Sequence, residues 1–130
     1  VANWTIAPAL LAGNAVVWKP SEKTPITALY YKYIIAKSLG EYAGLLQVLV
    51  GGRAAGEGLV QAENVKLVSA TGSVAMGRGI VETLSERQEW VMPPILELGG
   101  NNGVIFTRSM SEAHREWAVG AVLQSFLGSA

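Results

Sequence analysis

The residues from Ala15 to Pro25 constrain the fold most strongly, because they predict a buried strand, a polar turn and a helix start in direct succession. The apolar run Ala15–Trp18 contains two β-branched valines, and the polar residues Lys19, Ser21 and Glu22 follow it. Thr24-Pro25 then supplies an N-cap residue and a proline at the first helical position. In an open parallel sheet, ligands bind beyond the carboxyl ends of the strands. The segment therefore predicts a strand whose end carries polar side chains at a ligand-binding edge.

Strand and helix patterns alternate along the rest of the chain. A first helix is expected to stop at Gly13, and Gly40 is expected to end the second. The predicted strands are 15–19, 45–50, 65–69, 95–98 and 104–107, and the further predicted helices are 25–39, 54–62, 74–84 and 111–126. Such alternation predicts an α/β fold, a Rossmann-like, open, mostly parallel twisted sheet with flanking helices.

Composition excludes several classes of function. Half of the 130 residues are hydrophobic and 15% are charged, which favours a sheet covered on both faces, or a surface that further sequence covers. A formal net charge of zero leaves no electrostatic footprint for nucleic acid or an anionic membrane. The sequence contains neither Cys nor Asp, so disulfides are excluded and no metal site is expected. We expect a cytoplasmic chain without a membrane span, and one that begins at Val1 as a fragment would.

Lys19 and Glu22 are the first candidate binding residues. A lysine offers three donors, and a carboxylate can accept from two adjacent ribose hydroxyls. The same carboxylate would repel a 2′-phosphate, so the pair favours NAD over NADP. A solvated ion pair on the surface is the alternative that the spacing leaves open.

Thr71-Gly72-Ser73 and Glu97 are the other candidates. The first three residues predict a tight turn before a helix, where free amides and the Ser73 hydroxyl would bind a pyrophosphate. A plain serine N-cap is the alternative. Glu97 lies in an apolar strand before Gly99-Gly100, and apolar surroundings would raise its pKa and suit it to general-base catalysis. An outward-pointing side chain at a sheet edge is the alternative there.

Other side chains are expected to be structural. The aromatic residues Tyr30, Tyr33 and Trp117 have helical spacing and are predicted to pack in the core. The stretch 85–89 is predicted to be a charged surface, and His114 to be a solvated side chain in the first turn of its helix.

Five segments together resemble the NAD(P)-dependent aldehyde dehydrogenase superfamily, and they occur in the family's order over nearly the whole chain. The variant Leu96-Glu-Leu-Gly-Gly-Asn-Asn102 is most similar to the antiquitin-like, semialdehyde-oxidising branch. The matching segments are Ala7-Pro-Ala-Leu-Leu-Ala-Gly-Asn-Ala-Val-Val-Trp-Lys-Pro-Ser-Glu22, Thr24-Pro25, Gly51-Gly52 with Gly56, Thr71-Gly-Ser73 with Gly77, and Leu96-Glu-Leu-Gly-Gly100.

The resemblance implies a role for each candidate. Lys19 and Glu22 would hold the adenosine ribose hydroxyls, and Ser73 would meet the pyrophosphate. In the family's reaction a cysteine thiolate attacks the aldehyde, and hydride transfer to NAD then leaves a thioester on that cysteine. Glu97 would be the general base that activates the water that hydrolyses this thioester. The remaining positions would complete the cofactor site, with Gly51 and Gly56 on the adenine side, Gly99 at the nicotinamide end, and Ser21, Thr71 and Gly72 beside the residues above. Residues 1–98 would be part of the NAD-binding domain, and residues 99–130 would begin the catalytic domain.

The resemblance also has gaps. The family's nucleophilic cysteine would follow Ala130, and its Trp-Asn, whose amide helps to form the oxyanion hole, would precede Val1. Ala70 occupies a position where the family usually has Phe, which we expect to loosen packing beneath the pyrophosphate turn. We therefore expect a central fragment of an enzyme that oxidises an aldehyde with NAD and forms a homo-oligomer, and we expect the isolated chain to be inactive. The alternatives are a fragment of an NADPH-dependent acyl-phosphate or acyl-CoA reductase and a non-catalytic dinucleotide-binding remnant.

Overall fold

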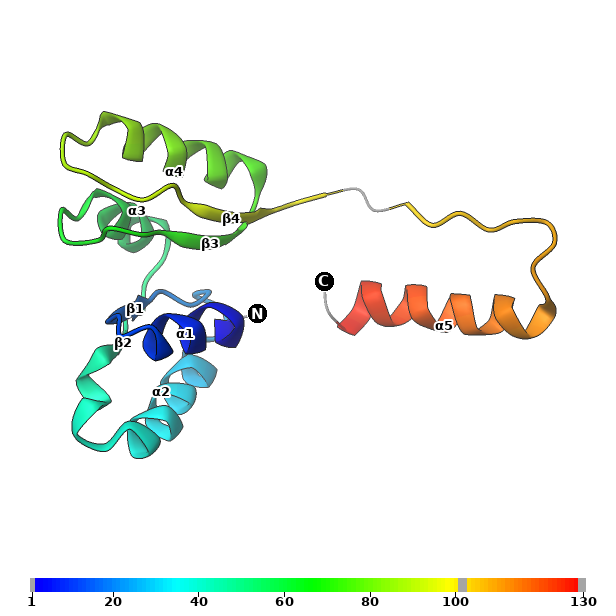
Figure 1. Ribbon diagram of the computed structural model, residues 1–130, viewed down its shortest axis with the longest axis horizontal. Coiled ribbons are helices and arrows are strands. Elements are labelled where there is room, and N and C mark those ends of the chain that lie inside the picture. Colours follow the sequence, from blue (N-terminus) through cyan, green and yellow to red (C-terminus); the bar gives the residue numbers. More distant parts are fainter. Residues whose placement is uncertain (1, 101–102, 129–130) are drawn as a thin grey trace. The chain divides into compact units, whose positions relative to one another are not determined.

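The computed structural model describes residues 2–100 and 103–128 of the chain (Figure 1). The chain divides into two compact units, Val1–Gly99 and Gly100–Ala130. The elements of the first unit are α1 (Ala2–Leu11), β1 (Val16–Trp18), α2 (Pro25–Leu39), the 3₁₀ helix η1 (Gly40–Leu45), β2 (Leu46–Val48), α3 (Arg53–Gln61), β3 (Ser69–Gly72), α4 (Val74–Glu86) and β4 (Ile95–Leu98), and the second unit contains α5 (Glu112–Gly128). None of the helices in the described residues is long and apolar enough to span a membrane.

The ends of the first two helices confirm the sequence predictions. Gly13 has a φ of +82° after α1, and its amide donates to the Leu10 carbonyl at 3.0 Å. Gly40 has a φ of +56° after α2, a backbone conformation that residues other than glycine rarely adopt. α2 begins with Pro25 at its first position, although the Thr24 side chain makes no capping hydrogen bond. Glycine and proline therefore set these boundaries.

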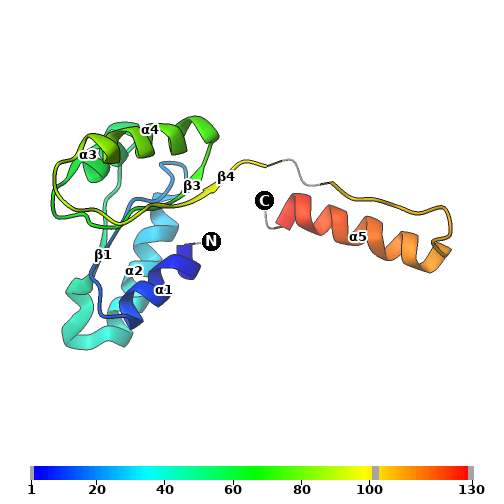
Figure 2. The ribbon, with the colours of Figure 1, turned by 45° about the horizontal axis from the view of Figure 1, so that its top comes forward.

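The strands form two parallel pairs, β1 with β2 and β3 with β4. The predicted parallel α/β class is confirmed, and the sheet consists of these two separate two-stranded pieces in the described residues. β1 and β2 are joined through α2 (Figure 1), and β3 and β4 are joined through α4, which Figure 2 shows from a second direction. Each pair is thus one strand–helix–strand unit.

The third strand lies later in the chain than its sequence predicted. Residues 65–68 run beside the segment that leads into β4, and the Met92 amide donates to the Lys66 carbonyl at 2.8 Å. The ladder proper begins at Ser69, which pairs with Ile95, and it continues through Gly72. The predicted turn residues Thr71 and Gly72 are therefore strand residues, and the turn into α4 begins only at Ser73.

α3 and α4 cover one face of the β3–β4 pair. The core consists of Val60, Ile80 and Leu84, which are 7–8% exposed, with Ala70 and Leu96 from the strands packed against them. The opposite face is exposed and carries the alternate strand residues Ser69, Thr71, Ile95 and Glu97. Of the two alternatives drawn from the composition, a sheet covered on both faces does not hold for this pair in the described residues, and the other, a surface that further sequence covers, stays a prediction.

The prediction that Tyr30 and Tyr33 of α2 pack in the core is also wrong, because the helix buries its other side. Ala28 is 1% exposed, and Tyr31 makes an edge-to-face contact with Trp18 of β1 at a centroid distance of 5.6 Å. Tyr30 and Tyr33, which were expected in the core, are 64% and 54% exposed and stack on each other instead. α2 packs against β2, and its buried residue Ala28 has a small side chain that suits close packing.

The second unit consists of an irregular segment and α5. Residues 104–107 form no strand, because the described part of this unit offers them no strand to pair with. Ser111 precedes α5, and its Oγ accepts a hydrogen bond from the His114 amide at 3.4 Å, as expected for an N-cap. Trp117 is 73% exposed, so its predicted core position is wrong as well. Asn101 and Asn102 lie outside the described residues.

Candidate functional site

Lys19 connects the carboxyl ends of β1 and β2. It follows β1 directly, and its Nζ donates to the Pro20 carbonyl at 2.9 Å and to the Gly51 carbonyl at 3.2 Å. Gly51 follows β2, whose Val48 pairs with Trp18 of β1. Because carboxyl ends of parallel strands meet at one edge of the sheet, Lys19 and Gly51 lie together where ligands bind in this class of fold.

Glu22 does not pair with Lys19. The Lys19 ammonium group donates to backbone carbonyls, and the described ion pairs do not include these two residues. The surface ion pair that the spacing allowed is therefore not formed. Glu22 and Ser21 are exposed, and the Ser21 Oγ accepts from the Lys23 amide at 3.3 Å. The Glu22 carboxylate can accept hydrogen bonds from a ligand at this edge.

Gly56 places the first turns of α3 against the lysine. A Cβ atom added at Gly56 would lie 3.5 Å from both Cδ and Cε of Lys19, so the glycine is in ordinary contact distance of the lysine stem. At Gly51 an added Cβ would lie 2.6 Å from the Ala55 Cβ, which is closer than real Cβ atoms approach. The structure thus brings Lys19, Gly51 and Gly56 together, and both glycines keep the backbone close to its neighbours.

The second group of candidates meets at the carboxyl ends of β3 and β4. Thr71 pairs with Glu97, and the Gly99 amide donates to the Gly72 carbonyl at 3.2 Å. Ser73 follows Gly72 directly. All five candidates from this half of the chain therefore lie at one sheet edge. Three are strand residues, and Ser73 and Gly99 directly follow β3 and β4.

The N-terminus of α4 offers hydrogen-bond donors at this edge. The Ser73 Oγ accepts from the Met76 amide at 3.1 Å, and the Ser73 carbonyl accepts from the Gly77 amide at 3.0 Å. In the described residues the amides of Val74 and Ala75 have no acceptor outside the helix. Ser73 is thus a true N-cap, and its hydroxyl proton, together with two amides at the positive end of a helix dipole, can still bind an anion.

Replacing Ser73 by Ala is expected to lower the free energy of unfolding by about 1 kcal/mol, because the Met76 amide loses its acceptor. Urea denaturation followed by circular dichroism measures the change. Ser85→Ala is the matched control in the same helix, since the Ser85 hydroxyl only donates back to the Glu82 carbonyl at 2.7 Å. Equal midpoints for the two variants would contradict a capping role for Ser73.

Glu97 lies on the exposed face of its strand. It shares this face with Ile95, which is 52% exposed, while Leu96 and Leu98 point toward α4. The apolar surroundings expected from the sequence are therefore wrong, because alternation along β4 turns the carboxylate outward. An exposed carboxylate beside Thr71 is accessible to water and to a ligand, and its catalytic role stays a prediction.

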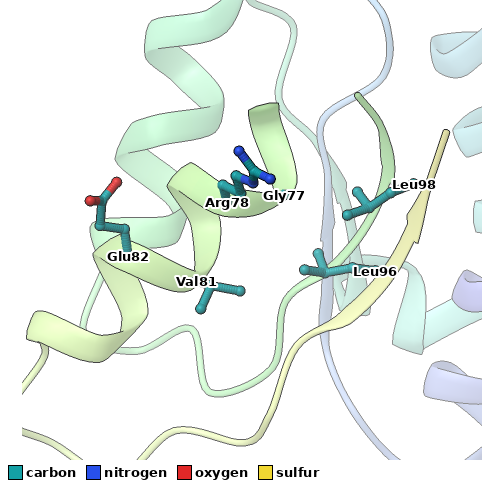
Figure 3. A pocket seen from close by; sticks show the side chains of 6 residues that line it. All are labelled: Gly77, Arg78, Val81, Glu82, Leu96 and Leu98. Carbon is teal, nitrogen blue, oxygen red and sulfur yellow. The ribbon is translucent and has the colours of Figure 1, made fainter. Parts of the chain in front are cut away.

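An open apolar groove of about 510 Å³ lies between α4 and β4. Figure 3 shows Leu96 and Leu98 of the strand directed toward Gly77 and Val81 of the helix. Arg78 and Glu82 complete its lining, and none of the sequence-predicted site residues contributes to it. The groove therefore lies outside the predicted cofactor site.

Sequence reasoning missed Arg87, whose side chain is only 7% exposed. Its Nη1 donates to the Val60 and Val65 carbonyls, each at 3.0 Å, and its Nη2 donates to the Glu63 carbonyl at 3.1 Å. It also pairs with Glu89, whose pKa is lowered by a hydrogen bond from its own backbone and by the Arg87 guanidinium. The predicted charged surface at 85–89 is therefore wrong at this position. The carbonyls that Arg87 binds lie 22 to 27 residues earlier in the chain, and no local sequence pattern predicts such contacts.

Comparison with known proteins identifies relatives along the whole chain. The model of the aldehyde dehydrogenase family matches residues 1–130. The chain is 41% identical to rat (Rattus norvegicus) 4-trimethylaminobutyraldehyde dehydrogenase over 128 residues, which are 98% of this chain and 24% of the rat protein. It is also 41% identical to betaine aldehyde dehydrogenase of Agrobacterium fabrum over 130 residues, which are 99% of this chain and 25% of that protein.

Solved structures agree with the sequence relatives. The chain is similar to a betaine aldehyde dehydrogenase point mutant from Staphylococcus aureus in complex with NAD⁺, with a TM-score of 0.66 and 33% identity over 76% of this chain and 19% of that one. A second similar structure, that of a lactaldehyde dehydrogenase, has a TM-score of 0.65 and 37% identity over 74% of this chain and 20% of that one. The chain spans about a quarter of the length of the two sequence relatives named above.

Proposed function

Because the chain belongs to the aldehyde dehydrogenase family, we propose that it is part of an enzyme that oxidises an aldehyde to a carboxylic acid with NAD. One observation carries the proposal. The residues expected to hold the dinucleotide lie at the carboxyl ends of two parallel strand pairs, and the N-terminus of α4 lies at the second of these ends. The similarity to a betaine aldehyde dehydrogenase in complex with NAD⁺ supports the choice of cofactor.

The residues at the first strand pair fit the adenosine half of NAD. The Lys19 ammonium has three donors, of which two are used by the Pro20 and Gly51 carbonyls. The third donor and the exposed Glu22 carboxylate can hold the adjacent ribose hydroxyls. Gly51 and Gly56 have no side chains, so they leave space beside Lys19 on the side where the adenine would lie.

The residues at the second strand pair fit the pyrophosphate and the reacting end. The Ser73 hydroxyl and the free amides of Val74 and Ala75 would bind the phosphate oxygens. Gly99, which lies beside Gly72, lets the backbone approach the nicotinamide end. NAD, when bound, supplies the acceptor for the hydride. The Glu97 carboxylate is exposed at this edge, where it can take a proton from the water that hydrolyses the acylated enzyme.

The substrate class follows from the family alone. The named relatives act on 4-trimethylaminobutyraldehyde and betaine aldehyde, and N-succinylglutamate 5-semialdehyde dehydrogenase of Erwinia tasmaniensis is 45% identical over 107 residues. That match covers 79% of this chain and 20% of the Erwinia protein. We propose an aldehyde substrate of this kind, a semialdehyde among the candidates.

A second candidate function is dinucleotide binding without catalysis. The sequence contains no cysteine, so these 130 residues supply no thiolate to attack an aldehyde. The purified chain is accordingly expected to bind NAD and to form no NADH from any aldehyde. NADH formation by the purified chain would contradict this candidate. It would also contradict the expectation that the nucleophilic cysteine lies outside these 130 residues.

Isothermal titration of the purified chain with NAD tests the proposal. Lys19→Met is expected to weaken NAD binding by about tenfold, because a hydrogen bond from a charged donor is lost. Glu22→Lys is expected to weaken NAD binding and to improve NADP binding, since the carboxylate no longer repels the 2′-phosphate. Lys37→Met is the matched control, because Lys37 lies over the Tyr33 ring in the last turn of α2, at the opposite end of the helix from the carboxyl end of β1.

Three results would be informative. If only the two site variants weaken NAD binding, the result supports contact of Lys19 and Glu22 with the adenosine ribose. Absence of NAD binding by the unmodified chain at millimolar concentration would overturn the binding role of the chain by itself. Equal NAD affinity in the unmodified chain and all three variants would show that the dinucleotide does not contact Lys19 and Glu22.

A further inference from the structure

We propose that oxidation of the Met76 thioether to the sulfoxide weakens dinucleotide binding at the carboxyl end of β3. The proposal rests on the cofactor role proposed above and adds a regulatory property to that site. Its basis is the position of one sulfur atom at the N-terminus of α4.

The Met76 side chain folds back over Gly72, the last residue of β3. A Cβ atom added at Gly72 would lie 2.7 Å from the Met76 Cε and 2.9 Å from its Sδ, so the thioether occupies the space where a side chain of residue 72 would stand. The Met76 amide donates to the Ser73 Oγ at 3.1 Å. Met76 therefore contacts both residues that lead into the proposed pyrophosphate turn.

The thioether is open to small oxidants. Met76 is 38% exposed, and the chain has no cysteine, so its three methionines are its only sulfur-containing residues. Hydrogen peroxide transfers one oxygen atom to the thioether sulfur and leaves as water, and the sulfur is oxidised to the sulfoxide as the peroxide is reduced. The reaction needs no other group of the protein.

The sulfoxide changes the site in two ways. It replaces an apolar contact with a polar, bulkier group where the thioether already lies against the backbone of Gly72. Its oxygen carries partial negative charge beside the turn whose Ser73 hydroxyl and first amides would bind an anion. Both changes oppose binding of a pyrophosphate, so the affinity for NAD is expected to fall.

Met92 provides an internal control within the same unit. It is 44% exposed and lies in the segment before β4, where its amide donates to the Lys66 carbonyl at the opposite end of the strand pair from Gly72. Oxidation of Met92 is therefore expected to leave the pyrophosphate turn unaltered.

The test compares NAD binding by calorimetry before and after treatment with hydrogen peroxide, with the oxidised positions mapped by mass spectrometry of peptides. Oxidation of Met76 is expected to weaken binding by about tenfold, the effect of losing one hydrogen bond to a charged group. Met76→Leu, which keeps the apolar cover, is expected to retain its affinity after treatment. Met92→Leu is expected to lose affinity as the unmodified chain does, and Met76→Gln, a polar stand-in for the sulfoxide, to bind weakly without peroxide.

The outcomes separate the two proposals. If the untreated chain does not bind NAD, the proposed cofactor role fails. If the untreated chain binds NAD and full oxidation at Met76 leaves the affinity unchanged, this inference alone is overturned. Treatment with methionine sulfoxide reductases gives a second readout, since recovery of affinity with reduction of Met76 supports the inference even if Met76→Leu does not fold. Lasting loss of affinity after Met76 is reduced would assign the effect to other damage and reject it.

Discussion

Replacing Arg87 by Met is expected to lower the free energy of unfolding by about 3 kcal/mol, because three backbone carbonyls, two of them in part-buried hydrogen bonds, lose a charged donor. The guanidinium group donates to the Val60, Glu63 and Val65 carbonyls, at 3.0–3.1 Å. Methionine has a similar length and keeps the apolar packing of the stem, so the change removes mainly the hydrogen bonds. For a chain of this size that loss is a large share of the total stability.

The effect is large because Arg87 closes the end of α3. The last carbonyls of a helix have no partner within the helix, and Val60 lies in the last turn of α3. Arg87 follows α4 directly, so one side chain ties the end of α3 and the connection to β3 to the end of α4. The ion pair with Glu89 adds stability above the ordinary carboxyl pKa, and that part is lost as the pH falls through the lowered pKa of the folded state.

Urea denaturation at neutral pH measures this change. The stability of Arg87→Lys is expected to be intermediate. A lysine keeps the charge, but its ammonium group lacks the planar, forked set of donors by which a guanidinium reaches three carbonyls. Arg115→Met is the matched control, since the exposed Arg115 side chain pairs with Glu112 at 3.2 Å and with no other carboxylate among the residues that the structure describes. An Arg87→Met variant as stable as Arg115→Met would show that the three carbonyls find water instead.

Local sequence signals were sufficient for the boundaries of several helices. α2 runs from Pro25 to Leu39 as predicted, because proline fixes the first turn and Gly40 takes a positive φ that ends the helix. The strand 95–98 was also located correctly, between a pair of prolines and a pair of glycines. These residues act through their own backbone preferences, which do not depend on the rest of the chain.

Contacts between residues distant in the sequence determine where strands form and which helix face is buried, and local sequence signals did not predict these features. The strand predicted at 65–69 forms at Ser69–Gly72, because the register of β3 is set by β4. Residues 104–107 have the composition of a strand, yet a strand requires a neighbour. The exposed face of α2 is as apolar as the buried one, so periodicity alone chose the wrong side.

The candidate site shows the same division. Family order located the residues, and the parallel register brings Glu97 beside Thr71 and Gly99 beside Gly72. The sequence did not reveal that the Lys19 ammonium holds the Gly51 carbonyl, or that Met76 covers Gly72. Those contacts depend on the distance between elements, which no residue pattern encodes.

Replacing Gly77 by Val is expected to lower the free energy of unfolding by about 3 kcal/mol, because α4 lies directly against β4 at this position. A Cβ atom at Gly77 would lie 2.5 and 2.6 Å from the two methyl carbons of Leu98 and 3.1 Å from its Cγ. Rotation of the two methyl groups about χ2 leaves the contact with Cγ, so Leu98 must leave its χ1 rotamer or α4 must move away from β4. Ser73 begins the same helix, and a shift of α4 would also displace the proposed pyrophosphate turn. NAD affinity is therefore expected to fall together with stability.

Gly79→Val is the matched control in the same helix, because a Cβ atom there would meet no atom within 4 Å. Its free energy of unfolding is expected to stay within about 0.5 kcal/mol of the unmodified chain, with unchanged NAD affinity. The double variant Gly77→Val with Leu98→Ala makes room for the new side chain, and its loss is expected to be smaller than the sum of the two single losses. Additive losses would show that the introduced valine side chain does not meet Leu98. A Gly77→Val variant that loses stability but keeps its NAD affinity would separate the packing of α4 on β4 from the geometry of the turn at Ser73.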